Sequence, residues 1–194
     1  MIFASCHFND KQEDKKSLID LKIIQTINPQ WISFYKIDIN HFTFTSKEVA
    51  KFNNGNILGD FDKTFNQFHK NLLINSPNNE NYIDLDSYSF ELIKNERNEI
   101  VIEGKEVDQE VNWVNRNSKE IKRLFFAASA EIEDAKWIDN KSVILFGRDN
   151  ANKCLFIEFI NLSDHEVVTY SYNTATNDKL SYSKSIRLNG IKNK

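Results

Sequence analysis

The chain has 194 residues, of which 40% are hydrophobic and 27% are charged, and its 25 basic and 28 acidic side chains give a net charge of −3. This length suits one domain, with at most a small extension, that buries most of its unfolded surface. The charges of both signs are interspersed, which excludes an electrostatic reason to bind nucleic acid. No apolar run reaches the roughly 18 residues of a transmembrane helix.

The first six residues, MIFASC, are apolar or small and end in a cysteine, and the polar stretch HFNDKQEDKKS follows at once. This junction resembles the lipobox of bacterial lipoproteins, in which a peptidase cuts before a cysteine that carries the lipid. The resemblance implies lipid attachment at Cys6 and a place in the bacterial cell envelope. The charged start and most of the apolar core of a signal peptide are missing. Two explanations are open. Either the true start codon and signal peptide lie upstream of Met1, or the match is accidental and the protein is cytoplasmic.

The composition divides the chain into a polar beginning and one folded part. We predict that residues 1–17 are a disordered or tether segment and that residues 18–194 form a single mainly-β domain. The two cysteines, Cys6 and Cys154, are too few for a disulfide framework. Cys154 lies in an apolar run, which favours a buried structural role.

The N-terminal third contains mixed signals. Leu18 to Ile27 fits either a buried strand or a short helix, and Pro29 ends it. Trp31 to Phe44 alternates with a period of two, which predicts a strand or hairpin. Thr45 and Glu48 have capping-box spacing, which predicts a short helix after that strand.

The strongest helical pattern lies between Asp60 and Leu73. Phe61, Phe65, Phe68 and Leu72 recur at the spacing of one helical face, and Asp60 is suited to cap the helix. This stripe predicts a helix that packs on the core.

From Ile74 onward the pattern becomes that of β-hairpins. Val111 to Leu124 aligns without a gap on Ile157 to Tyr170 at an offset of 46 residues, so that Trp113 meets Phe159 and Asn115 meets Asn161. A period of this size is typical of propeller blades and related arrays. We therefore predict a repeated unit at about residues 74–126 and 127–172. The first copy carries extra residues, enough for an added hairpin at Glu91 to Glu103.

The start of the second copy carries a family resemblance. Trp137-Ile138-Asp139-Asn140-Lys141, followed by an apolar strand, resembles the W-S-P-D-G-K start of the propeller repeats in TolB-like proteins. The resemblance implies blade-like antiparallel sheets over about residues 74–172. Two or three such units are too few for a closed propeller. We therefore expect a mainly-β fold of blade-like sheets, an incomplete propeller or a sandwich, with one or two helices on the N-terminal side that cover exposed sheet edges.

No motif of catalysis, cofactor binding or metal binding is present. The four histidines are isolated from one another and from cysteine, so none has metal-ligand spacing. Phosphate-binding loops, dinucleotide fingerprints and nucleophile elbows are absent. We name no catalytic, cofactor-binding or metal-binding residue, expect no cofactor and lean against an enzyme.

Two carboxylate clusters are the candidate site. Asp84 and Asp86 would share one face of a strand, and Glu131 and Glu133 would also point together, with Asp134 beside them. Such pairs suit a hard cation or general acid and base chemistry. The alternatives are a solvated outer face or a turn. We treat these five residues as a candidate acidic rim.

Three functions remain open. The first is a non-catalytic binding or scaffolding module, lipid-anchored or not, for an unknown protein or carbohydrate partner. Trp31, Trp113 and Trp137 would line its groove if they are not in the core. The second is a hydrolase that uses the carboxylates at the mouth of a sheet. The third is a soluble, partner-neutralising protein of the immunity type.

Overall fold

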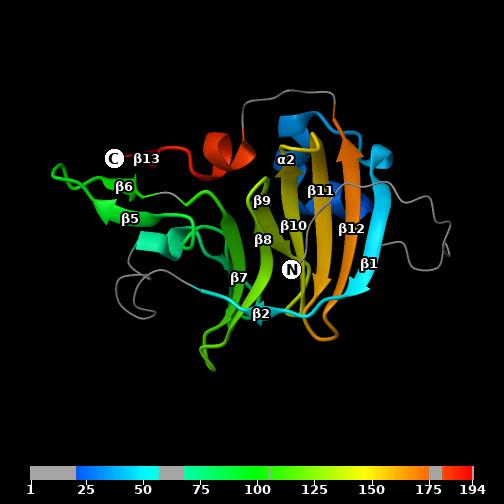
Figure 1. The fold of residues 1–194 in the computed structure, drawn as a ribbon, viewed down its shortest axis with the longest axis horizontal. Helices are drawn as coiled ribbons and strands as arrows, with labels where there is room; N and C mark the ends of the chain where they lie inside the picture. The colour runs from blue at the N-terminus through cyan, green and yellow to red at the C-terminus, as the bar shows by residue number, and fades with distance from the viewer. Residues whose placement is uncertain (1–20, 57–67, 105, 175–180, 194) are drawn as a thin grey trace.

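The computed structural model describes residues 21–56, 68–104, 106–174 and 181–193. Over this part the chain is mainly β, with two five-stranded antiparallel sheets and a small three-stranded sheet (Figure 1). The prediction of a mainly-β fold with antiparallel blade-like sheets and helices on the N-terminal side is confirmed. No helix in the described ranges is long and apolar enough to cross a bilayer.

Sheet A contains the C-terminal hairpins and one N-terminal strand. Its strands, in spatial order, are β1 (Thr43–Val49), β12 (Glu166–Asn173), β11 (Cys154–Asn161), β10 (Ser142–Asp149) and β9 (Ala130–Trp137).

Sheet B has the same number of strands and packs against sheet A. Its order is β2 (Asn53–Asn54), β8 (Ile121–Ala127), β7 (Gln109–Asn115), β4 (Asn81–Asp84) and β3 (Ile74–Asn75). Sheet C consists of β5 (Glu91–Lys94), β6 (Ile100–Glu103) and β13 (Lys192–Asn193), the last of which runs parallel to β6.

Five short helical segments complete the described part of the chain. They are α1 (Lys22–Ile27), α2 (Pro29–Tyr35), the 3-10 turns η1 (Ile39–His41) and η2 (His69–Asn71), and the π-helical turn η3 (Ser183–Arg187).

Sheet A is buried on both faces. One face, with Ile132, Leu145 and Phe156, packs against Val111 and Phe125 of sheet B. The opposite face packs on the N-terminal helices, and its core cluster includes Trp31, Phe146, Ile157 and Tyr170. The central strand β11 is therefore almost continuously buried. This explains the apolar run around Cys154, which is itself buried as expected.

The two stretches related by the offset of 46 residues occupy equivalent places. One forms the hairpin β7–β8 in sheet B, and the other forms β11–β12 in sheet A. In both turns an asparagine side chain, Asn115 or Asn161, accepts a hydrogen bond from the backbone N–H two residues later. Both turns also contain a residue in the left-handed conformation, Lys119 at φ 63° and His165 at φ 62°. The extra residues of the first copy form β5 and β6.

The N-terminal segment corrects two predictions. Most of Trp31 to Phe44 is not a strand or hairpin: its start belongs to α2, its middle contains η1, and only Thr43 and Phe44 lie in a strand, β1. Asn28 caps α2 by accepting a hydrogen bond from the backbone N–H of Trp31, and Pro29 occupies the first helical turn. The helix predicted after Thr45 is strand β1, whose residues pair with β12. Tertiary pairing at the edge of sheet A outweighs the capping-box spacing. The Leu18 to Ile27 segment resolves as helix α1 over its described part.

Three predictions fall wholly or mostly on residues that the structure does not describe. The tether at residues 1–17 and the lipid attachment at Cys6 lie outside the described residues. So does most of the helix predicted from Asp60 to Leu73, of which only the end, including η2, is described.

Candidate functional site

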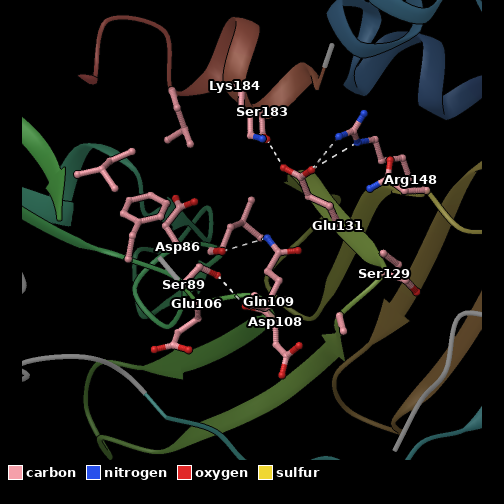
Figure 2. Close-up of a pocket in the computed structure, with 18 of the residues that line it drawn as sticks. Asp86, Ser89, Glu106, Asp108, Gln109, Ser129, Glu131, Arg148, Ser183 and Lys184 are labelled. Carbon is pink, nitrogen blue, oxygen red and sulfur yellow. Dashed lines mark hydrogen bonds and ion pairs between the residues drawn. The ribbon is translucent and has the colours of Figure 1, made fainter. Parts of the chain in front are cut away.

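A cavity of about 440 Å³ lies where sheet C, the C-terminal segment (residues 181–191, which include η3) and one end of sheet A meet. Sheet C and the C-terminal segment supply apolar lining, including Ile102, Leu188 and Ile191. The end of sheet A supplies a polar wall with Glu131 and Arg148, which are cross-strand partners on β9 and β10 (Figure 2). The cavity is thus lined by both apolar and polar side chains.

The remaining lining residues come mainly from the loops that lead into these strands. They are Leu85, Asp86, Ser89, Phe90, Glu106, Val107, Asp108, Gln109, Ala128, Ser129, Ala130, Asn150, Ser183 and Lys184.

The C-terminal segment is fastened beside the cavity by a buried ion pair. Arg187 donates two hydrogen bonds to the carboxylate of Asp86, at 2.5 and 2.7 Å. Its Nε atom also donates to the backbone carbonyl of Glu133 at 3.0 Å. Bidentate geometry of this kind fixes position as well as charge. Asp86 therefore holds η3 against the two sheets.

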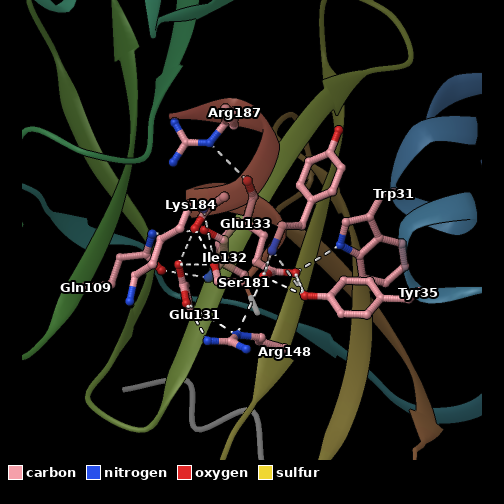
Figure 3. Close-up of polar contacts among 12 residues, drawn as sticks. Trp31, Tyr35, Gln109, Glu131, Ile132, Glu133, Arg148, Ser181, Lys184 and Arg187 are labelled. Carbon is pink, nitrogen blue, oxygen red and sulfur yellow. Dashed lines mark hydrogen bonds and ion pairs between the residues drawn. The ribbon is translucent and has the colours of Figure 1, made fainter. Parts of the chain in front are cut away.

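Glu133 lies at the centre of a second network, which joins helix α2 to sheet A (Figure 3). Its carboxylate accepts hydrogen bonds from the Trp31 indole at 3.1 Å, the Tyr35 hydroxyl at 2.7 Å and the backbone N–H of Tyr182 at 2.8 Å. The Nε atom of Arg148 lies 3.5 Å away. Burial raises the pKa of Glu133, and the hydrogen bond from Tyr35 opposes that rise.

Glu131 connects the polar wall of the cavity to the C-terminal segment. It accepts a hydrogen bond from the Ser183 hydroxyl, and one oxygen lies 3.3 Å from Nη2 of Arg148 (Figure 2). It also accepts a hydrogen bond from the Ser181 hydroxyl (Figure 3). Glu131 and Glu133 therefore both lie close to the same guanidinium group. Glu131 is the member of this pair that lines the cavity.

A β-bulge in β9 explains the direction of these acidic side chains. Phe146 pairs with Asp134 and Gly147 pairs with Ile132, so Glu133 is an additional residue on its strand. A bulge of this kind turns successive side chains away from strict alternation. Glu133 and Asp134 consequently both contact the N-terminal helical segment, Asp134 through the amide of Asn28 at 3.0 Å.

Asp84 is buried in the turn that follows β4. It accepts hydrogen bonds from the backbone N–H groups of Asp86 and Ser87, each at 3.0 Å, and from the Ser87 hydroxyl. Burial raises its pKa, and the hydrogen bonds from Ser87 oppose the rise. His69 is also buried nearby, and its pKa is lowered by burial against the attraction of Asp84 and Asp86. Asp84 therefore stabilises this turn, a role that the sequence had suggested for Asp86 and Asp134 instead.

The five candidate acids are therefore not together on an exposed rim. Four of them are buried, and the fifth, Glu131, is partly exposed in the cavity wall. Only Asp86 and Glu131 line the cavity, and each is bonded to an arginine. A solvated outer face, the other alternative, does not describe the four buried acids.

The three tryptophans are packing residues. Trp31 is fully buried in the core between sheet A and the helices. Trp113 and Trp137 are half-buried against the core between the two large sheets. None of them lines the cavity.

Sequence reasoning missed the basic partners, Arg148 and Arg187, and the bridging amide of Gln109. Gln109 donates to the backbone carbonyls of Leu85 and Ile132 at 3.1 and 3.0 Å, and so ties sheet B to β9 beside the cavity. One sequence signal was available for Arg187, which is the single arginine of the C-terminal segment. No group of three or more histidine, cysteine or acidic residues in the described ranges is arranged to hold a metal ion.

No protein-family model, curated protein or solved structure matches this chain. The fold and the cavity are thus the basis on which a function is proposed.

Proposed function

We propose that the protein is a non-catalytic binding module and that the cavity between sheet C, the C-terminal segment and sheet A is its binding site. The observation that carries the proposal is a cavity of about 440 Å³ with apolar and polar walls. Ligand sites in proteins have volumes of roughly 300–1,000 Å³ and combine apolar lining with a few polar groups. A side chain of a protein partner or one sugar unit is of the right size.

The buried networks support recognition rather than catalysis. Asp86 is neutralised by Arg187, and Glu133 is surrounded by donors from Trp31, Tyr35 and Tyr182. These contacts hold the cavity walls in place before a ligand arrives, and a pre-formed site reduces the entropy cost of binding. A general acid or base needs access to its substrate, and these two carboxylates are occupied by structural partners.

The hydrolase hypothesis stays a prediction with weaker support. It requires two acids among Asp84, Asp86 and Glu133 to converge on one pocket, whereas Asp86 alone of these three lines the cavity. Turnover of a generic ester, phosphoester or glycoside that is lost in Asp86→Asn, with the fold intact, would favour it.

A fragment screen with a cavity-blocking variant tests the proposal. Ala128 is exposed at the cavity wall, so Ala128→Trp places an indole in the mouth without altering the core. Ala151→Trp is the matched control, because Ala151 is also exposed, lies in a neighbouring turn and does not line the cavity.

We expect fragments that bind the unmodified protein and Ala151→Trp to lose binding to Ala128→Trp. A screen without hits, or hits that bind Ala128→Trp equally well, would contradict the proposed site.

A further inference from the structure

The cavity lining has an excess of acidic side chains. It contains Asp86, Glu106, Asp108 and Glu131 but only two basic residues, Arg148 and Lys184. The charge of Asp86 is already balanced by Arg187, which lies behind the wall. The ligand class therefore depends on the other charged residues of the lining, which are Glu106, Asp108, Glu131, Arg148 and Lys184.

Two of these acids have no structural partner. The carboxylates of Glu106 and Asp108 make no hydrogen bond or ion pair with any other residue in the described ranges. They follow one another closely in the loop that leads from β6 to β7, and this loop is fixed by hydrogen bonds between Ser89 and the backbone of Glu106 and Asp108. Two negative charges are thus presented from a tethered loop at the wall of a cavity.

The positive charge in the opposite wall is already shared. The guanidinium of Arg148 lies 3.3 Å from Glu131 and 3.5 Å from Glu133, so it serves two carboxylates. Lys184 is exposed on η3. Lys184 offsets one of the two charges of Glu106 and Asp108, and the lining keeps an excess of negative charge. An anionic ligand at Arg148 would have to compete with Glu131 and Glu133 for the guanidinium group, whereas a cation would reduce the excess negative charge.

The apolar part of the lining favours a cationic group that is attached to a hydrocarbon chain. Phe90, Ile102, Leu188 and Ile191 offer hydrocarbon surface on the sheet C side. A methylene chain that ends in a charged group can lie along such a surface while its head meets the carboxylates. A small hydrated metal ion would leave this wall without a contact.

We propose that the cavity receives an alkylammonium or alkylguanidinium group, as carried by a lysine or arginine side chain or by a free amine. This inference rests on the proposed binding function and specifies its ligand class. It makes Glu106 and Asp108 the residues that select for positive charge.

A series of probes of equal length tests the charge preference. Pentylammonium, pentanol and pentanoate share the same chain and differ in the head group. We expect pentylammonium to bind the protein at least several-fold more tightly than pentanol, and pentanoate to bind most weakly, in titrations followed by amide chemical shifts.

A pair of peptides distinguishes a protein partner from a free amine. The pair consists of acetylated Gly-Lys-Gly amide and its norleucine analogue. Tighter binding of the lysine peptide than of pentylammonium indicates a protein partner, and the reverse order indicates a free amine.

Three charge-removing variants complete the test. Glu106→Gln and Asp108→Asn should each weaken pentylammonium binding by about two- to fivefold, the effect of losing one partly exposed ion pair. Glu96→Gln is the control, because Glu96 is exposed at the tip of the β5–β6 hairpin and does not line this cavity.

Two outcomes would overturn the inference. If pentanol or pentanoate binds as tightly as pentylammonium, the cavity binds ligands but does not select cations, and the proposed binding function stands alone. If none of the probes binds, the ligand class is wrong, and the independent fragment screen decides whether the binding function fails as well.

Discussion

Glu158 gives a prediction about stability that does not depend on the ligand. Its carboxyl group is buried in β11 on the face between sheets A and B, and neither oxygen has a hydrogen-bond partner. Burial raises the pKa of Glu158 from an ordinary 4.5 to about 8, with a further contribution from the charge of Glu48. The folded protein therefore holds this proton at neutral pH, whereas the unfolded chain releases it.

The direction and size of the pH effect follow from this difference. Because the pKa is higher in the folded state, the stability associated with this proton is complete below pH 4.5 and is lost as pH rises through about 8. Each pH unit between the two values costs about 1.4 kcal/mol of unfolding free energy. The wild-type protein should thus lose about 3 kcal/mol between pH 4.5 and 7 because of this one group.

Glu158→Gln isolates the effect, because the amide is nearly the same shape and does not ionise. Urea unfolding of both proteins from pH 4.5 to 9 should show a stability difference that grows in favour of the variant up to about pH 8 and is constant above it. Glu48→Gln, a change at an exposed neighbour, should leave most of the slope in place. A stability difference between wild type and Glu158→Gln that does not change with pH would show that the pKa of Glu158 is not raised by folding.

The remaining predictions concern the two networks and the N-terminus. Arg187→Met should destabilise the protein by about 3–5 kcal/mol because it leaves Asp86 buried without its counter-charge; adding Asp86→Asn should recover part of that loss in urea unfolding, and strict additivity would contradict the pairing. Tyr35→Phe should cost about 1–3 kcal/mol, because Glu133 loses its shortest hydrogen bond, and an unchanged unfolding midpoint would argue against this network. Lipid attachment at Cys6 predicts an acylated N-terminal peptide by mass spectrometry after expression in the native host, and an unmodified cysteine there would exclude it.

The hairpins of the second half could be predicted from the sequence because their signals are local. Asparagine turns such as those at Asn115 and Asn161 lie between largely apolar strands, and the turn hydrogen bonds that such residues make are present in the structure. The added hairpin at β5 and β6 was predicted for the same reason.

The N-terminal elements could not be predicted equally well. Trp31 to Phe44 shows a strand-like alternation, but the cap at Asn28 and the first-turn Pro29 make a helix instead. Thr45 and Glu48 satisfy a helix signal, yet the edge of sheet A recruits them into β1. In both cases a local pattern was compatible with two structures, and packing selected one.

The burial and bonding of the acidic residues could not be predicted from the sequence, because their partners are distant along the chain. Arg187 is 101 residues from Asp86, and Trp31 is 102 residues from Glu133. The spacing along each strand is the same for a solvated face and a buried network. The bulge at Glu133, which turns two adjacent acids toward the helices, has no sequence signal that we can identify.

The binding-site assignment is tested most directly by mapping where a bound fragment contacts the protein. In amide chemical-shift titrations, we expect the largest changes at cavity residues such as Ser89, Ser129 and Asn150, and no change at the β7–β8 turn around Ser118. Changes concentrated at that turn, or spread evenly over the surface, would contradict the assignment of the cavity as the binding site.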